Sequence, residues 1–380
     1  MEANRQMHHK ASAVNPDAHV AWTMLAVVVL SAACRQAPTA TPKTNPTTAT
    51  TRATLVELGD FRADLTPEMV VRAAQGKALF NKKFTAAEGL GPHFNFASCG
   101  SCHDQPTSGG HSDMAHQARL TFIDGDVDGL PQQTLPGFNP LQPVPGAPVS
   151  MHRPPALFGL GLVEAIDDTY LREHCGVDKH LGIAGIANFN LGQNRVSRFG
   201  LKAHTATIRD FVGNALNLEM GLTNPVERDS RHFRDGDAVP DPEVPTSTVD
   251  LLADYVGALA PPPAPPTDPA AERLFADVGC ATCHRPQTAV GVQAYSDFCL
   301  HDLGSGFDNK MNDFRATGSH WRTPALWGLR FRNKYFHDDR TGDLRTAIAV
   351  HRGEAAQVSQ RFAALPTAQQ EVLLQWLRQL

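Results

Sequence analysis

Cys99-Gly100-Ser101-Cys102-His103 and its second copy, Cys280-Ala281-Thr282-Cys283-His284, decide the fold of this 380-residue chain. The spacing C-x-x-C-H is typical of c-type haem attachment, in which each cysteine sulfur adds across a vinyl group of the porphyrin. The histidine that follows is then held under the iron as its proximal ligand. A pair of Cys-x-x-Cys zinc or disulfide sites is the alternative interpretation. The two copies predict two covalently bound c-type haems, with His103 and His284 as iron ligands.

The composition is that of a soluble globular protein. Hydrophobic residues make up 42% of the chain and charged residues 19%, and the formal net charge is −5. This charge gives no electrostatic reason to expect a nucleic acid as partner. The length is sufficient for two domains of ordinary size.

The first 53 residues predict export. Residues 20–33 are apolar, too few for a spanning helix, and end in small side chains, as a signal sequence does. Because Cys34 follows at once, residues 1–34 resemble a bacterial lipoprotein segment. Residues 35–53, rich in Thr, Pro and Ala, predict a disordered linker. We expect a periplasmic protein anchored to the membrane by a lipid at Cys34, and the true start codon stays open.

A proline run divides the rest of the chain. Residues 261–267 form a stiff spacer that neither a helix nor a central strand accommodates. The spacer separates residues 54–260 from residues 268–380, and each part has one C-x-x-C-H segment. Each part also begins with an N-cap residue followed by proline, at Thr66 and at Asp268.

The two parts share further marks in the same order. Residues 153–160 resemble residues 322–329, and each part closes with an apolar stretch, at 251–256 and at 372–377. Such repetition predicts an internal duplication. Because strand signals are sparse, we expect a mainly α protein with two cytochrome c-like domains and long haem-wrapping loops.

Several motifs together resemble the di-haem oxidoreductase family, whose members are described as peroxidases or thiol oxidoreductases. These motifs are residues 89–95, 98–103, 109–110, 153–166, 198–203, 219–222 and 321–329. Residues 335–340 carry a wider likeness to bacterial di-haem cytochrome c peroxidases and to MauG-type enzymes. Leu201 stands where the family commonly has tryptophan, and Asp339 replaces a common glycine. An aromatic relay through position 201 is therefore not expected.

The resemblance implies a division of labour between the two haems. A haem with ligands on both faces transfers electrons, whereas a haem with an open face can bind peroxide. In the peroxidases a methionine seven residues after a motif leucine binds the C-terminal haem, and the same count from Leu344 reaches His351. The resemblance thus implies His351 as the distal ligand of the second haem. Met311 is the alternative ligand, and a solvated His351 is the other alternative.

The predicted duplication suggests that the first haem is open. Aligning the two parts places Ala215 opposite His351, so this haem would lack a ligand at that point. Met220 or His204 could instead bind the first iron, which would make this domain an electron relay.

Two carboxylates are candidate catalytic acids for the first haem. The same alignment puts Asp210 where the peroxidases have a glutamate that moves a proton between the peroxide oxygens. Glu164 has apolar neighbours that would raise its pKa. An ordinary exposed helix residue is the alternative interpretation of Asp210.

Arg153 and Arg322 occupy equivalent positions and are candidates to hold haem propionates through bidentate contacts. Surface or structural roles for both arginines are the alternative. Trp321 could lie between the haems, although core packing is the more usual role. Cys175 and Cys299 remain after haem attachment and lipidation, as a bridge between domains or as two buried thiols.

The sequence therefore predicts an exported di-haem c-type oxidoreductase that reduces peroxide at the first haem. Electrons would come from a small redox protein through the second haem, and hydrogen peroxide or a similar oxidant would be the substrate. The alternatives are a di-haem electron-transfer protein without substrate chemistry and a MauG-like oxidant of a partner protein. A calcium ion between the domains, seen in related peroxidases, has no supporting ligand cluster in the sequence.

Overall fold

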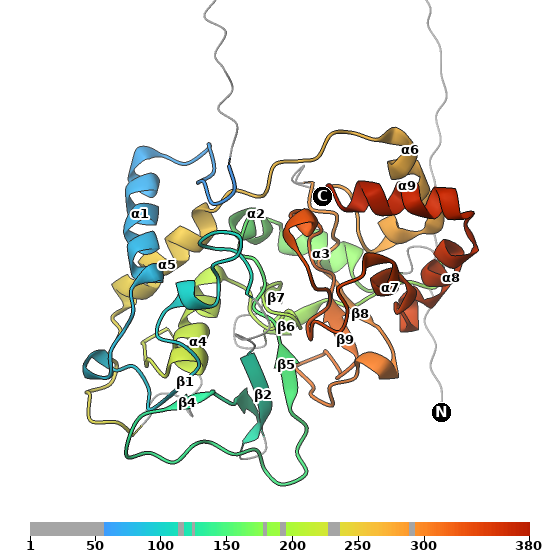
Figure 1. Cartoon of the computed structure of the whole chain (residues 1–380). Coiled ribbons are helices and arrows are strands. Elements are labelled where there is room, and N and C mark those ends of the chain that lie inside the picture. The colour runs from blue at the N-terminus through green and yellow to red at the C-terminus, as the bar shows by residue number, and fades with distance from the viewer. Residues whose placement is uncertain are drawn as a thin grey trace, which may run out of the picture. The chain divides into compact units, whose positions relative to one another are not determined.

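A computed structural model describes most of the chain after residue 56, as one compact unit within Thr54–Leu380 (Figure 1). The described residues are 57–112, 118–123, 126–177, 181–190, 195–226, 236–288 and 293–380. The predicted signal segment and linker lie outside them. Among the described residues, no helix has the length and apolar character that a bilayer crossing requires.

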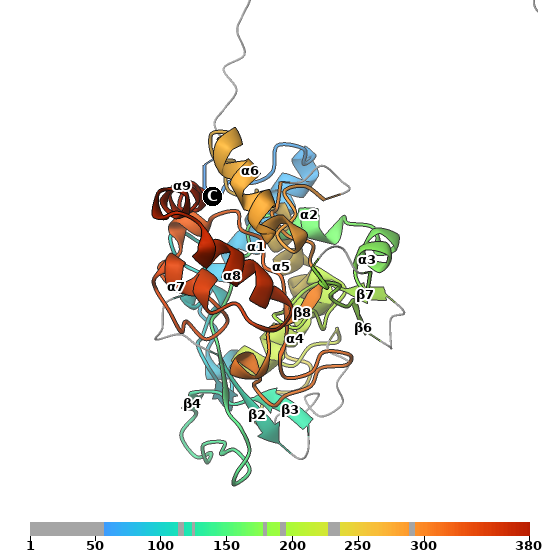
Figure 2. The ribbon, with the colours of Figure 1, turned by 90° about the vertical axis from the view of Figure 1, so that its right-hand side faces the viewer.

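Helices make up most of the regular structure, as the sequence predicts. They are α1 (Pro67–Asn81), α2 (Leu160–Glu164), α3 (Asp168–His174), α4 (Ile208–Met220), α5 (Thr246–Ala258), α6 (Pro269–Val278), α7 (Leu344–Ala349), α8 (Ala356–Ala364) and α9 (Thr367–Leu377). Both predicted N-caps are present, because the Thr66 side chain accepts a hydrogen bond from a backbone N–H of α1 and Asp268 accepts two from α6. Figure 2 shows α6, α8 and α9 gathered on one side of the unit.

The strands are short and form small antiparallel sheets. The pairs are β1 (His93–Phe94) with β4 (Gln133–Thr134), β2 (Ala118–Ile123) with both β3 (Asp126–Gly129) and β5 (Ser150–His152), β6 (Asn188–Asn190) with β7 (Arg195–Ser197), and β8 (Leu300–Asp302) with β9 (His320–Arg322). In the last pair His301 lies opposite Trp321. Both side chains line the same cavity.

The N-terminal part is built on the contact between α1 and α5. The Phe80 ring packs against the Tyr255 ring, with centroids 4.9 Å apart. The helices approach so closely at Gly76 that a Cβ atom there would lie 1.9 Å from the Leu251 carbonyl oxygen. Only glycine permits this approach, because any other residue would push the helices apart.

The C-terminal part repeats this arrangement with α6 and α9. Phe275 packs against Trp376, with ring centroids 5.2 Å apart, and Tyr295 also contacts Trp376 at 5.5 Å. In both parts, therefore, an aromatic residue of the closing helix packs on a phenylalanine of the opening helix. The internal duplication itself stays a prediction.

A disulfide joins segments that are far apart in the sequence. Cys175, directly after α3, is bonded to Cys299, directly before β8, across a sequence separation of 124 residues. Phe298 and Cys299 pack in the same hydrophobic core as Phe80 and Tyr255. Of the two alternatives for this cysteine pair, the structure therefore shows the disulfide. It links the segment that follows the proline run to the hydrophobic core of the N-terminal part.

The helix contact at Gly76 generates a stability prediction. Gly76→Ala should lower the free energy of unfolding by about 1–3 kcal/mol, because the new methyl group meets backbone rather than a movable side chain. Guanidinium titration of the purified protein measures this change. Gly306→Ala is the control, because nothing lies within 4 Å of a Cβ atom there. Equal stability of the two variants would contradict the close contact.

Candidate functional site: two cavities, each with one C-x-x-C-H segment

Each C-x-x-C-H segment opens onto its own cavity. Cys99, Cys102 and His103 line what we call the first cavity. Cys280, Cys283 and His284 line the second cavity. Both cavities are walled mainly by apolar side chains, as a porphyrin site requires. The wall between them is shared, and it is made of Arg153, Pro154, Pro155, Leu160 and Leu201.

The four cysteines of these segments lie on tight turns and are not disulfide-bonded. The segments begin with short 3₁₀ helices, at Cys99–Ser101 and at Cys280–Thr282. Burial raises the pKa of Cys99 and of Cys280 to about 12. Both side chains are therefore thiols at neutral pH, next to a cavity of the kind a macrocycle would fill.

The histidine of each segment is oriented by backbone carbonyl groups. The Nδ1 atom of His103 lies 3.1 Å from the Gly110 oxygen and 3.0 Å from the Pro155 oxygen. The Nδ1 atom of His284 lies 3.0 Å from the Tyr295 oxygen. A carbonyl can only accept, so Nδ1 must carry the proton and Nε2 is left with a lone pair for a metal. Such a contact is the usual support of a metal-binding histidine.

Burial also keeps these imidazoles neutral. It lowers the pKa of His103, and it lowers the pKa of His284 to about 4 with a further contribution from nearby His351. A neutral imidazole is the form that binds iron. Both predicted proximal ligands are thus in the right tautomer and charge state.

His351, the predicted distal ligand, lines the second cavity. Its Nδ1 atom donates to the Ala347 carbonyl oxygen at 2.8 Å, which leaves Nε2 as the acceptor. Burial lowers its pKa, so this ring too is neutral. Met311, the alternative ligand, is buried elsewhere and does not line the cavity. The structure thus brings His284 and His351 to one cavity, each with Nδ1 held by a carbonyl.

The first cavity contains both residues that could close its iron. His204 and Met220 line it, together with Ala215. The Nδ1 atom of His204 lies 3.4 Å from a carboxylate oxygen of Asp313, and Met220 is buried. The open first haem therefore stays a prediction, and so does its alternative, a relay with a sixth ligand.

The two predicted catalytic acids hold the start of α4 and do not line either cavity. Asp210 accepts a hydrogen bond of 2.5 Å from the Thr207 hydroxyl at the N-terminus of this helix. Glu164 accepts from the Ile208 backbone N–H at 2.7 Å. Their positions match helix capping, so the structure lends no support to a catalytic role of either residue.

Glu219 is a carboxylic acid of the first cavity that was not among the candidates predicted from the sequence. Among the described residues that line the first cavity, it is the only carboxylic acid. Burial raises its pKa, although a 2.5 Å hydrogen bond from the Asn95 side-chain amide opposes this shift. The signal was in the sequence, because Glu219 belongs to residues 219–222, which carry part of the family resemblance.

Arg153 lies in the wall between the cavities, but its charge is already compensated. It forms a buried ion pair of 3.0 Å with Asp339, and its Nε atom donates to the Ser112 carbonyl oxygen at 2.7 Å. Arg322, its predicted counterpart, lines only the second cavity and donates to the Gly200 carbonyl oxygen at 3.0 Å. The two arginines are therefore not equivalent in their surroundings.

An aromatic cluster spans the region between the cavities. The Trp321 and His337 rings are stacked, with centroids 3.5 Å apart and planes inclined by 10°. His152 contacts both rings edge-on, at 5.7 and 5.8 Å. Trp321 and His337 line the second cavity and His152 lines the first. Aromatic rings thus lie between the cavities although position 201 is a leucine.

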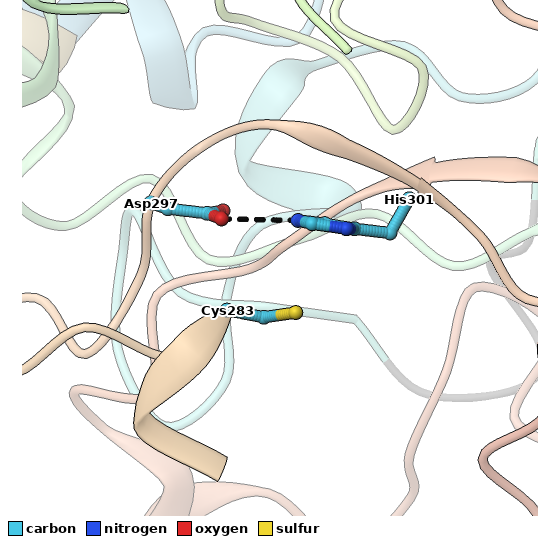
Figure 3. A group of neighbouring side chains, drawn as sticks. All are labelled: Cys283, Asp297 and His301. Carbon is cyan, nitrogen blue, oxygen red and sulfur yellow. Dashed lines mark hydrogen bonds and ion pairs between the residues drawn. The ribbon is translucent and has the colours of Figure 1, made fainter. Parts of the chain in front are cut away.

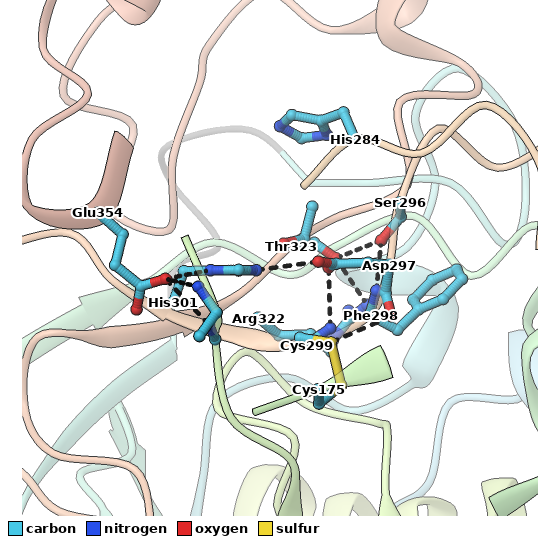
Figure 4. Close-up of polar contacts among 12 residues, drawn as sticks. Cys175, His284, Ser296, Asp297, Phe298, Cys299, His301, Arg322, Thr323 and Glu354 are labelled. Carbon is cyan, nitrogen blue, oxygen red and sulfur yellow. Dashed lines mark hydrogen bonds and ion pairs between the residues drawn. A yellow bond between two sulfur atoms is a disulfide. The ribbon is translucent and has the colours of Figure 1, made fainter. Parts of the chain in front are cut away.

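A buried ionic cluster lies beside the second C-x-x-C-H segment. One ligand atom each of Cys283, Asp297 and His301 lies within 4.8 Å of the others, a grouping that could hold a metal ion (Figure 3). Both ring nitrogens of His301 are already bonded, Nε2 to Asp297 at 3.0 Å and Nδ1 to Glu354 at 2.8 Å (Figure 4). The ring is therefore used as a cation between two carboxylates rather than as a metal ligand.

This ionic cluster makes stability depend on pH. Burial opposes the charged form of His301, but the hydrogen bonds that its ring makes to Asp297, Cys283 and Glu354 outweigh this effect and raise its pKa to about 12. Because this lies above the ordinary value of 6.5, the stabilisation is complete below pH 6.5 and is lost as pH rises toward 12.

We therefore expect the stability advantage of the wild type over His301→Gln to shrink between pH 6.5 and pH 9, by up to about 1.4 kcal/mol per pH unit. Urea titrations at several pH values measure it. His174→Gln is the control, since the His174 Nδ1 contacts the Tyr170 carbonyl oxygen rather than a carboxylate. Parallel curves for wild type and His301→Gln would contradict the charged histidine.

Comparison with known proteins gives one family match and several distant structural likenesses. The family described as "Di-haem oxidoreductase, putative peroxidase" matches residues 269–380. No curated protein matches the chain. Among solved structures, the chain resembles hydrazine synthase of Kuenenia stuttgartiensis with 17% identity, 90% of this chain and 100% of that chain covered, and a TM-score of 0.42.

The diheme peroxidase BthA of Burkholderia thailandensis E264 is similar at 16% identity, with 84% of this chain and 87% of that chain covered and a TM-score of 0.45. A MauG-like protein associated with microbial copper homeostasis is similar at 14% identity, with 59% and 89% covered and a TM-score of 0.32. Residues 269–380, which include His284 and His351 of the second cavity, thus match the model of the di-haem oxidoreductase family, and this match confirms the resemblance seen in the sequence.

Proposed function

We propose that this protein is an exported di-haem c-type oxidoreductase that reduces peroxide at the first haem with electrons relayed through the second. One observation carries the proposal. Each C-x-x-C-H segment lines its own apolar cavity, and the Nδ1 atom of its histidine is held by a backbone carbonyl. When bound, a haem with a free axial position supplies the site that takes peroxide and the electrons that cleave its oxygen–oxygen bond.

The state of the cysteines supports covalent attachment. In the described part of the chain, Cys175 and Cys299 are bonded to each other. The four cysteines of the C-x-x-C-H segments line the cavities and form no disulfide. A protein that forms a disulfide in an oxidising compartment would be expected to close these pairs as well, unless they served another purpose. Thioether bonds to two porphyrins would use all four.

The second cavity is suited to electron transfer. His284 and His351 both line it, each neutral and each with Nε2 left for a metal. Ligation by both would leave no position for substrate and would lower the reduction potential relative to a histidine–methionine pair. A small redox protein is the electron donor that fits such a closed centre.

In the first cavity, Glu219 has the environment of a general acid and base. Asn95 fixes one carboxylate oxygen, Oε2, and the other, Oε1, has no hydrogen-bond partner among the described residues. Since burial raises the pKa of this carboxyl above its ordinary value, Oε1 is better able to hold a proton and pass it on. We infer that Glu219, rather than Asp210 or Glu164, moves the proton between the oxygens of peroxide.

A second function, a pure electron carrier, is favoured by one observation. His204 and Met220 both line the first cavity, and either could close that iron. A MauG-like oxidation of a partner protein is the remaining alternative. Lipid anchoring at Cys34 in the periplasm is part of the proposal, and it rests on the sequence alone.

Paramagnetic resonance of the matured ferric protein separates these functions. We expect one high-spin signal, from the first haem, that cyanide shifts, and one low-spin signal from the second. His351→Ala should convert the low-spin signal to high spin, because it removes the sixth ligand. His174→Gln serves as the control. Two low-spin signals together with no peroxide turnover would favour the electron carrier, and an unchanged low-spin signal in His351→Ala would refute that ligand.

Steady-state peroxide reduction tests the acid. Glu219→Gln should lower kcat by roughly 10²–10⁴-fold, the usual contribution of a positioned general acid–base group. Asp210→Asn should instead act on stability, by about 1 kcal/mol, through the weakened start of α4. A large loss of kcat in Asp210→Asn with none in Glu219→Gln would show that the alignment, and not the cavity, identifies the acid.

A further inference from the structure

The second cavity contains positive charge that the protein itself does not neutralise. Three guanidinium groups line it, from Arg153, Arg322 and Arg332. Asp339 is the carboxylate beside them, and it forms the ion pair with Arg153. Glu354 also lines the cavity, but its carboxylate is bound to His301. The three guanidinium groups therefore have one carboxylate among them, and Lys334 also lines the cavity.

Arg332 is the least compensated of the three. Its guanidinium group makes no hydrogen bond or ion pair with any residue in the part of the chain that the structure describes. Arg322 donates to carbonyl oxygens of Gly200 and Thr323 but has no carboxylate partner there. Burial lowers the pKa of both arginines to about 10, and for Arg322 the charge of Arg332 adds to this shift. The two cations are thus close enough to repel each other.

Two neighbouring cations in an apolar cavity are costly unless an anion lies between or beside them. The planar fork of a guanidinium matches a carboxylate through paired N–H···O bonds. Most of the remaining wall is apolar and includes Phe275, Leu326 and Leu344. The ligand that fits is therefore an apolar body with two carboxylates at one edge.

We propose that Arg322 and Arg332 form a dicarboxylate site that binds the two propionates of the second haem. This inference rests on the proposed function, because it requires a haem in the second cavity. Arg153, by contrast, acts through Asp339 as part of the wall between the cavities and does not bind propionate.

The first cavity has no equivalent of this pair. Arg153 is the only arginine or lysine among its described lining residues, and Asp339 neutralises it. The protein therefore places its uncompensated positive charge beside one haem only. Positive charge near a haem favours the reduced state, so the pair would raise the potential of the second haem specifically.

Redox titration of the holoprotein, followed at wavelengths that distinguish the two haems, tests the site. Arg332→Gln should lower the equilibrium constant for reduction of the second haem at least tenfold, which is about 59 mV for a one-electron couple. The first haem should change much less. Arg332→Lys keeps the charge and should stay within about threefold of the wild type. Arg361→Gln, at an exposed position of α8, is the control.

Each outcome decides a question. A second-haem potential in Arg332→Gln equal to that in Arg361→Gln would overturn the inference. Loss of the second haem in Arg332→Gln, with retention in Arg332→Lys, would support it. A wild-type potential that falls as acetate or chloride is added would show a site open to free anions, and would overturn the assignment to propionates. Absence of a second haem from the wild type would instead refute the proposed function.

Discussion

The hydrogen bonds from the Nδ1 atoms of His103 and His284 to backbone carbonyls are the contacts on which the rest of the site depends. They settle which ring nitrogen is free, and they do so with main-chain atoms whose positions the fold fixes. The carbonyls come from loops that pack around each cavity. The same loops must therefore be in place before either histidine can serve as a proximal ligand.

The shared wall gives the two cavities different chemistry. Arg153 lies in this wall, where Asp339 neutralises its charge, and Leu201 adds an aliphatic side chain to it. The first cavity contains a carboxylic acid and two candidate iron ligands. The second contains the neutral pair His284 and His351 and two arginines without a carboxylate partner among the described residues. A peroxide-reducing centre needs a proton source, whereas an electron relay needs closed coordination and a tuned potential. Each set of side chains matches one of these needs.

Much of the fold was predictable from local signals, and the two C-x-x-C-H segments most directly. The spacing C-x-x-C-H, the capped helix starts at Thr66 and Asp268, and the helix-rich character all act over a few residues, and the structure has them. The sequence did not lead to Glu219, the acid that we propose, because aligning the two parts as repeats pointed to Asp210. Only the three-dimensional packing separates a residue of the cavity wall from a residue at a helix start. The role that we propose for Arg332 could not be predicted either, because the sequence does not show which side chains lie near it in the folded protein.

The central claim is that both cavities hold a porphyrin fixed by two thioether bonds. The most direct test is the intact mass of the exported, matured protein under denaturing conditions, followed by mapping of its peptides. We expect a mass increased by two haems, one on the peptide with Cys99 and Cys102 and one on the peptide with Cys280 and Cys283. Recovery of all four cysteines as unmodified thiols or as disulfides would contradict it.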